Sequence, residues 1–181
     1  RSGHREIYYK CRPTGSTQWS ADLQVSSSGI EARAPAIAGD GDAVHVVWQD
    51  YASGNWAIYH RQCTADGYWS EPVCVFESVV EVGSDPIRRC QMAWEPELVV
   101  CQGQVLVGVP IGSDRLRVFR RDLDESWSTL TIVNAPDPEL DPLYTKILPQ
   151  GIAMACSDPL SYMAWQEVLG NERILKNVKR E

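Results

Sequence analysis

The stretch from Ala34 to Asp50 reads APAIAGDGDAVHVVWQD, and it decides the fold because the chain repeats it. The stretch from Gly151 to Glu167 reads GIAMACSDPLSYMAWQE, which aligns Trp48 with Trp165, 117 positions away. A third copy begins at Pro96, where VLVGVPI stands in the place of VHVVWQD. The copies recur roughly every 58 residues, and a fixed period of this size is typical of repeat architectures.

Each repeat is expected to contain four short strands, because runs rich in β-branched and aromatic residues alternate with clusters of Gly, Asp and Asn. No stretch keeps apolar residues at helical spacing for long enough to predict a helix. In the best copy the predicted strands are Pro35–Ala38, Val44–Gln49, Ala57–Gln62 and Trp69–Phe76.

The second strand of each repeat carries apolar residues on both of its faces. Val44, Val46 and Trp48 alternate with His45, Val47 and Gln49. A sheet with one face in water would alternate cleanly between apolar and polar residues, so these sheets are expected to be covered on both sides. Four-stranded meanders stacked radially in this way are propeller blades. We therefore predict an all-β chain built from β-propeller blades of four antiparallel strands.

Ile-Tyr and Trp-Ser pairs align between the copies, so the whole chain, 1–181, is predicted to be one propeller segment. It has about three blades, whereas a closed ring needs four to eight. The division is 1–30 as the end of one blade, 31–80 and 81–132 as blades, and 133–181 as an incomplete blade. A proline-rich acidic loop, 134–144, is a predicted partner contact. The ring is expected to be completed by further sequence or by partner chains. The chain is therefore expected to be an excerpt, a cleaved product or a ring-closing oligomer.

The order of strands and turns resembles bacterial propellers built from sialidase-type repeats, also called BNR or Asp-box repeats. The Asp-box has the pattern Ser-x-Asp-x-Gly-x-x-Trp, and each copy here departs from it. The segment ending at Trp19 lacks the Asp, the one ending at Trp69 is one residue short, and the one ending at Trp127 lacks the Gly. The resemblance implies an exported protein, extracellular or periplasmic.

Antiparallel topology predicts that polar residues from several blades meet on one rim near the propeller axis. Loops on a rigid scaffold commonly carry function. The predicted rim residues are Glu31, Arg33, Trp48, Gln49, Asp50, Tyr51, Asn55, Arg88, Arg89, Glu95, Asp114, Tyr144, Lys146, Trp165, Gln166, Glu167 and Asn171.

Three functions remain open for this rim. We expect first a non-catalytic scaffold or interaction module within a larger assembly, which needs no special residue. A lectin-like alternative would bind glycans through Trp48, Gln49, Asp50, Asn55, Trp165, Gln166 and Glu167. Against it, the middle copy has Val109-Pro110-Ile111 at the equivalent place. The resemblance also implies a sialidase-like exo-glycosidase, with Arg33 and Arg88 or Arg89 holding a carboxylate, and Tyr144 and Glu167 as nucleophile and helper.

Composition excludes some partners and leaves the cysteines open. The net charge is −7 and the pI about 5.0. The sequence has no basic stripe of the kind that would indicate nucleic-acid binding. No apolar run is long enough to predict a membrane span. The six cysteines permit three disulfides in any of 15 pairings, or simple burial in strands. Cys11 and Cys63 nearly align between repeats, but the one-residue offset predicts opposite faces of their strands.

No cofactor or structural metal is expected from the motifs, since no cysteine or histidine lies at metal-ligand spacing. The segments Asp40-Gly41-Asp42 and Asp137–Asp141 could offer oxygen ligands to calcium, but tight turns explain them better. His45 and His60 lie in predicted strands and are interpreted as packed or surface residues rather than ligands.

Overall fold

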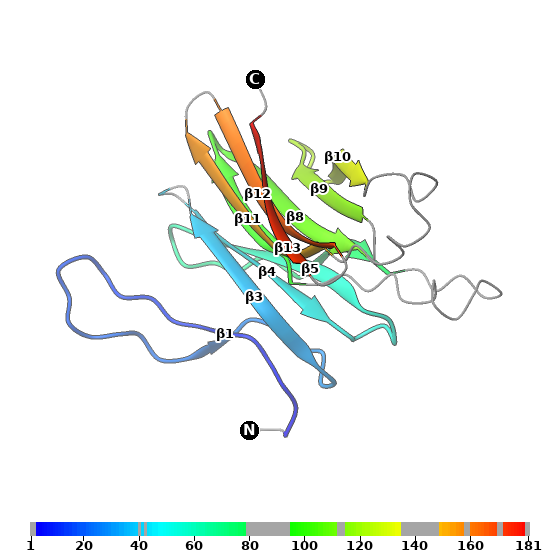
Figure 1. The fold of residues 1–181 in the computed structure, drawn as a ribbon. Helices are drawn as coiled ribbons and strands as arrows, with labels where there is room; N and C mark the ends of the chain where they lie inside the picture. The colour runs from blue at the N-terminus through cyan, green and yellow to red at the C-terminus, as the bar shows by residue number, and fades with distance from the viewer. Residues whose placement is uncertain are drawn as a thin grey trace.

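The chain folds into antiparallel β-sheets, as Figure 1 shows. The structure is a computed structural model that describes residues 3–39, 41, 43–78, 95–111, 115–134, 149–157, 160–169 and 172–179. These residues contain no helix and form four sheets, each made of strands that are consecutive in the sequence. The prediction of an all-β chain is confirmed.

The N-terminal sheet is a two-stranded hairpin whose connecting segment extends away from the other sheets (Figure 1). Its strands are β1 (Tyr8–Tyr9) and β2 (Leu23–Gln24). Just before β1, Arg5 forms an isolated parallel bridge with Glu31, which leads into the next sheet. This bridge joins the hairpin to the sheet that follows it in the chain.

The second sheet is a meander in which each strand pairs with the next along the sequence. Its strands are β3 (Ala32–Gly39), β4 (Ala43–Asp50), β5 (Ala57–Thr64) and β6 (Val73–Glu77). The four predicted strands of this copy are therefore present, although β3 is longer at both ends and β6 begins later than expected.

The repeated Trp-Ser pairs predict the start of the outer strand in each copy, but β2 and β6 begin only at Leu23 and Val73, so this prediction is wrong in the first two sheets. Ser70 bonds Gln62 twice: its amide donates to the Gln62 carbonyl, and its hydroxyl accepts from the Gln62 amide at 3.1 Å. Ser20 forms the same two hydrogen bonds with Cys11. In each case the serine hydroxyl accepts the hydrogen bond that a backbone carbonyl of the outer strand would otherwise accept. Regular strand pairing therefore starts only three residues after the serine.

The third and fourth sheets repeat the meander order. The third contains β7 (Glu97–Cys101), β8 (Gln104–Ile111), β9 (Arg115–Arg121) and β10 (Trp127–Asn134). The fourth contains β11 (Pro149–Ser157), β12 (Leu160–Leu169) and β13 (Glu172–Lys179). In the third sheet the outer strand does begin at the Trp-Ser pair, and it runs two residues past the predicted boundary at 132.

Both faces of the second sheet pack against neighbouring sheets. On one face the main core joins the second and third sheets, and on the other the smaller core joins the second and N-terminal sheets. Strand β4 contributes Val47 to the main core and Val46 and Trp48 to the smaller core. The main core consists of Val47, Ile58, Val75, Leu98, Val105, Val107, Val109, Ile111 and Phe119. The smaller core consists of Ile7, Val25, Ala32, Val46 and Trp48.

Successive sheets touch through their first strands, because β3 contacts β7 and β7 contacts β11. Strand β8 also contacts β11, and Gly108 makes this approach close. A Cβ at Gly108 would lie 2.7 Å from the Met154 sulfur and would also clash with Ile152. A disulfide between Cys101 and Cys156, with Cα atoms 5.7 Å apart, joins the third and fourth sheets.

Candidate functional site

The rim at the start of β3 and the end of β4 is shaped by a bulge in β3. Arg33 pairs with Gln49 and Ala36 with Val47, so β3 has one extra residue between these pairs. Pro35 cannot donate a ladder hydrogen bond, and Ala34 has a φ of 50°, in the left-handed region. Bulges re-aim side chains and occur often next to functional sites. A similar register shift lies between Pro149 and Ile152 of β11.

Arg33 is the centre of the rim cluster. Its Nε donates to Gln49 Oε1 at 2.7 Å, and its guanidinium lies 3.9 Å from the centre of the Trp56 ring. One terminal nitrogen is 3.9 Å from Glu31, which also accepts a 3.2 Å bond from Arg5. The Arg33 side chain keeps 33% of its surface exposed, so its outer edge remains accessible to a partner.

The aromatic part of the cluster is a Tyr51–Trp56 pair whose ring centres are 5.1 Å apart. Both side chains are partly exposed. The sequence analysis placed Tyr51 on the rim but missed Trp56. The missed signal is positional: Trp56 directly precedes β5, and the start of β5 lies at the same end of the sheet as the end of β4.

The other predicted residues of this copy are mostly buried. Trp48 is 1% exposed and Asp50 is 3% exposed, and the Trp48 indole donates to the Asp50 carboxylate at 2.8 Å. Asp50 also accepts the Ala52 amide at 3.0 Å. Gln49 is 1% exposed and holds Arg33. Asn55 is partly exposed in the turn, where its amide bonds the Ser53 hydroxyl.

The rim residues predicted from the later copies are not brought into this cluster by the described part of the chain. Glu95 is described and exposed. The backbone positions of Trp165, Gln166 and Glu167 lie in β12. The remaining predictions lie outside the described residues: Arg88, Arg89, Asp114, Tyr144, Lys146, Asn171, the loop 135–144, and the calcium candidates Asp40, Asp42 and Asp137–Asp141.

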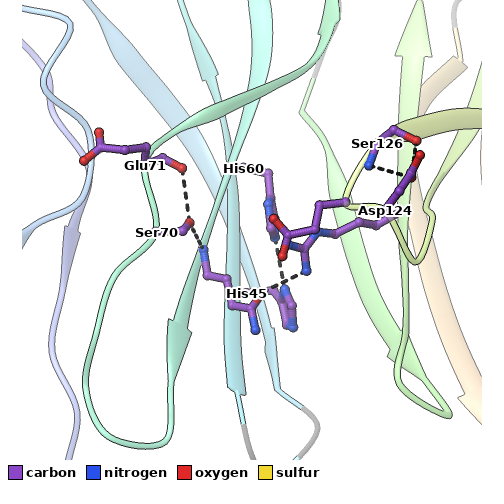
Figure 2. Close-up of polar contacts among 9 residues, drawn as sticks. His45, His60, Ser70, Glu71, Asp124 and Ser126 are labelled. Carbon is purple, nitrogen blue, oxygen red and sulfur yellow. Dashed lines mark hydrogen bonds and ion pairs between the residues drawn. The ribbon is translucent and has the colours of Figure 1, made fainter.

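A second polar feature lies inside the interface between the second and third sheets. His45 and His60 are each 2% exposed, and their Nδ1 and Nε2 atoms are 3.0 Å apart (Figure 2). The His60 ring packs edge-on against Trp127 of β10, with centres 5.2 Å apart. Burial, together with the neighbouring His45 and Arg121, lowers the pKa of His60 to about 3. His60 is therefore neutral at physiological pH, and both histidines are packed residues, one of the two alternatives that the sequence left open.

The rim can recognise a partner through a cation stacked on an aromatic ring, the Arg33 guanidinium on Trp56. Arg33 offers planar donors that suit a carboxylate, and Trp56 holds the guanidinium in place. The carboxylate of Asp50 is buried and bonded within the chain. Among the described residues, no group of three His, Cys, Asp or Glu side chains is arranged to hold a metal ion. No helix in the described part is long and apolar enough to cross a membrane.

Comparison with known proteins adds no family to this description. No protein-family model matches the sequence, and no curated protein matches it.

Proposed function

We propose that this chain is a non-catalytic interaction module built as part of a β-propeller of the sialidase-type repeat class. The arrangement is supported by the meander order of each sheet and by contacts between the first strands of successive sheets. It is further supported by β4 and β8, which are buried on both faces. Sheets fanned around an axis are expected to bury both faces in this way.

Further blades, from a longer chain or from a partner, are part of this proposal. In β11, Ile152 and Met154 face Gly108 of the third sheet. The alternate residues Ala153 and Ala155 are exposed, and Tyr162 opposite Ala155 is 36% exposed. A further sheet packed on this apolar surface would continue the same stacking.

The observation that carries the interaction function is the partly exposed cluster of Arg33, Trp56 and Tyr51 on a rigid sheet end. Arg, Trp and Tyr are the residue types that most often dominate protein–protein binding energy. The acid and amide groups next to them are bonded within the chain, which favours holding a partner over turning over a substrate. We propose a protein partner that meets this rim.

Export to an extracellular or periplasmic site is part of the same proposal. It rests on the repeat resemblance, and the Cys101–Cys156 disulfide is compatible with an oxidising compartment.

Site-specific photo-crosslinking in cells tests the partner. A crosslinking amino acid at position 51 should capture one protein, and Arg33→Ala in the same chain should abolish the capture. The matched control is position 123, where Leu123 is fully exposed in the turn between β9 and β10 and should not capture that protein.

Two parallel assays decide between this function and the alternatives. The purified chain is incubated with a fluorogenic sialoside and applied to a glycan array. We expect neither hydrolysis nor glycan binding. Hydrolysis that disappears in Arg33→Ala would replace the proposal with a sialidase-like enzyme, and glycan binding that disappears in Trp56→Ala would replace it with a lectin.

A further inference from the structure

A pocket of about 570 Å³ lies between the N-terminal and second sheets, and two cysteines line it. Cys11 follows β1 and is exposed, whereas Cys63 lies in β5 and is buried. The pocket wall also includes Tyr9 from the first sheet and Trp69 from the second. Neither thiol is part of the rim cluster.

The strand geometry makes these two thiols face one another. Tyr9 packs edge-on against Trp69, with ring centres 5.1 Å apart, so it points towards the second sheet. Cys11 is two residues beyond Tyr9, and in an extended chain residues two apart share a face. Trp69 pairs with Cys63 in an isolated bridge, so these residues share the opposing face. A hydrogen bond between Tyr9 and Cys11 contributes, after burial, to the raised pKa of Tyr9.

The repeat spacing agrees with this geometry. Ile7 and Ile58 are equivalent and 51 residues apart, but Cys11 and Cys63 are 52 apart. A one-residue offset places two side chains on opposite faces of equivalent strands. In stacked sheets, opposite faces of neighbouring sheets are the ones that meet, so the offset brings the thiols together.

The existing disulfide obeys the same rule. Cys101 and Cys156 are 55 residues apart, whereas the equivalent positions Val109 and Trp165 are 56 apart. Cys101 lies at the end of β7 and Cys156 near the end of β11, and the bond joins the third sheet to the fourth. Both cysteine pairs therefore differ from the repeat spacing by one residue.

We propose that Cys11 and Cys63 form a second inter-sheet disulfide, which ties the N-terminal sheet to the second sheet when the protein meets a small-molecule disulfide such as oxidised glutathione. The bond joins two residues that line the pocket and fixes the hairpin of β1 and β2 on the second sheet.

The reaction balances as two thiol–disulfide exchanges. The exposed Cys11 thiolate attacks oxidised glutathione, which gives a mixed disulfide at Cys11 and releases one glutathione. The Cys63 thiolate then attacks the Cys11 sulfur and releases the second glutathione. The two thiols lose two protons and two electrons, and one oxidised glutathione becomes two reduced molecules. Burial raises the pKa of Cys63, so the second step should accelerate as rising pH ionises this thiol.

Peptide mapping of the full chain tests the proposal. Cys74 and Cys90 are replaced by Ser, and the protein is equilibrated with glutathione buffers of rising oxidised fraction before the remaining thiols are blocked. We expect a peptide that links Cys11 to Cys63. The midpoint of thermal unfolding should rise by roughly 5 °C or more in the oxidised sample. The Cys101–Cys156 peptide in the same digest shows that disulfides survive the procedure.

Single variants separate this bond from a general effect of oxidant. Cys11→Ser changes an exposed residue and should keep the fold, yet it should lose the thermal shift, and Cys63→Ser should lose it too. Restoring Cys74 should leave the shift unchanged. The proposal is overturned if Cys11 and Cys63 carry only glutathione, or if neither reacts under conditions that retain the Cys101–Cys156 bond.

Discussion

The second sheet meets different neighbours through its two faces, although the same strands supply both. Towards the third sheet it presents Val47 and Ile58 to a continuous apolar core, with the histidine pair enclosed. Towards the N-terminal sheet it presents Trp48 to a smaller core, and a pocket opens beside Cys63. Among the described residues the first interface has a buried core of nine apolar residues, whereas the second has five, with a pocket beside them and a hydrogen bond from Arg61 to the Val25 carbonyl.

This difference shows how alternating side chains can set the strength of each joint separately. Every odd or even position of β4 belongs to only one interface, so a substitution weakens one neighbour and leaves the other. Successive sheets are therefore expected to be held together by interfaces of unequal strength. The four changes below test this description, from the largest expected effect to the smallest.

Trp48→Ala should remove the main anchor of the N-terminal interface. Trp48 is 1% exposed, and truncation leaves a cavity and takes the indole donor from Asp50. We expect a loss of about 3–5 kcal/mol in the free energy of unfolding, measured by urea denaturation. Trp19→Ala is the control, since Trp19 is 60% exposed and should cost little. Equal losses in the two variants would contradict the anchor role.

Acid should weaken the interface that holds the histidine pair. The folded-state pKa of His60 is about 3, below its ordinary value of 6.5, so the unfolded chain binds a proton in this window and the folded chain does not. Stability is therefore full above pH 6.5 and falls as pH falls towards 3, by about 3 kcal/mol between pH 7 and pH 4. Urea denaturation across this range measures the slope.

The matched variant for the acid effect is His60→Gln, which should flatten that slope because the titrating group is gone. The groups facing His60 are His45 from the same sheet, and Arg121 and Trp127 from the third sheet. His4→Gln, which changes an exposed histidine, is the control variant. A slope that survives in His60→Gln would assign the effect to another group.

Gly108→Ala should strain the joint between the third and fourth sheets. The added Cβ would lie 2.7 Å from the Met154 sulfur and would clash with Ile152. Both contacts are ends of flexible side chains, so we expect a loss of about 2 kcal/mol rather than failure to fold. Combining it with Met154→Ala should recover part of the loss in a double-mutant cycle, and simple additivity would argue against the close contact.

Arg61→Gln should loosen the N-terminal interface by the smallest amount. Arg61 donates to the Val25 carbonyl across the interface at 2.8 Å and to the Ser70 carbonyl at 2.7 Å. We expect a loss of about 1–2 kcal/mol in the free energy of unfolding. Arg120→Gln is the control, because Arg120 pairs with Asp122 on the surface and should cost less than about 0.5 kcal/mol.

The sequence was sufficient to predict strands, turns and the two-faced burial of β4, because repeated patterns report local pairing and burial together. It placed Arg33 and Tyr51 at one end of a sheet for the same reason. It could not place Trp56 over Arg33, since that contact depends on the bulge at Ala34 and on side-chain rotamers. The late start of β6 was missed because the Ser70 hydroxyl takes over a backbone role, which composition does not reveal.

The pairing of His45 with His60 was missed for a related reason. The two residues lie on neighbouring strands at diagonal positions, and their contact follows from the register His45↔Gln62 and Val47↔His60. The sequence predicts the face of the strand on which each histidine lies, but only the pairing register between β4 and β5 brings the two side chains together. The same holds for the disulfide. The count of cysteines permitted many pairings, and only the contact between β7 and β11 shows that Cys101 bonds Cys156.

Contiguity of each sheet in the sequence has a consequence for synthesis. Since β3 to β6 are consecutive strands, all their ladder partners have left the ribosome once residue 77 has emerged. Each sheet can then pair its strands while the next is still being translated, and it docks on its predecessor as it is completed. A newly made sheet shows one uncovered apolar flank until its successor arrives, so a translational pause within 95–111 would expose Val47 and Ile58 to aggregation or to a chaperone.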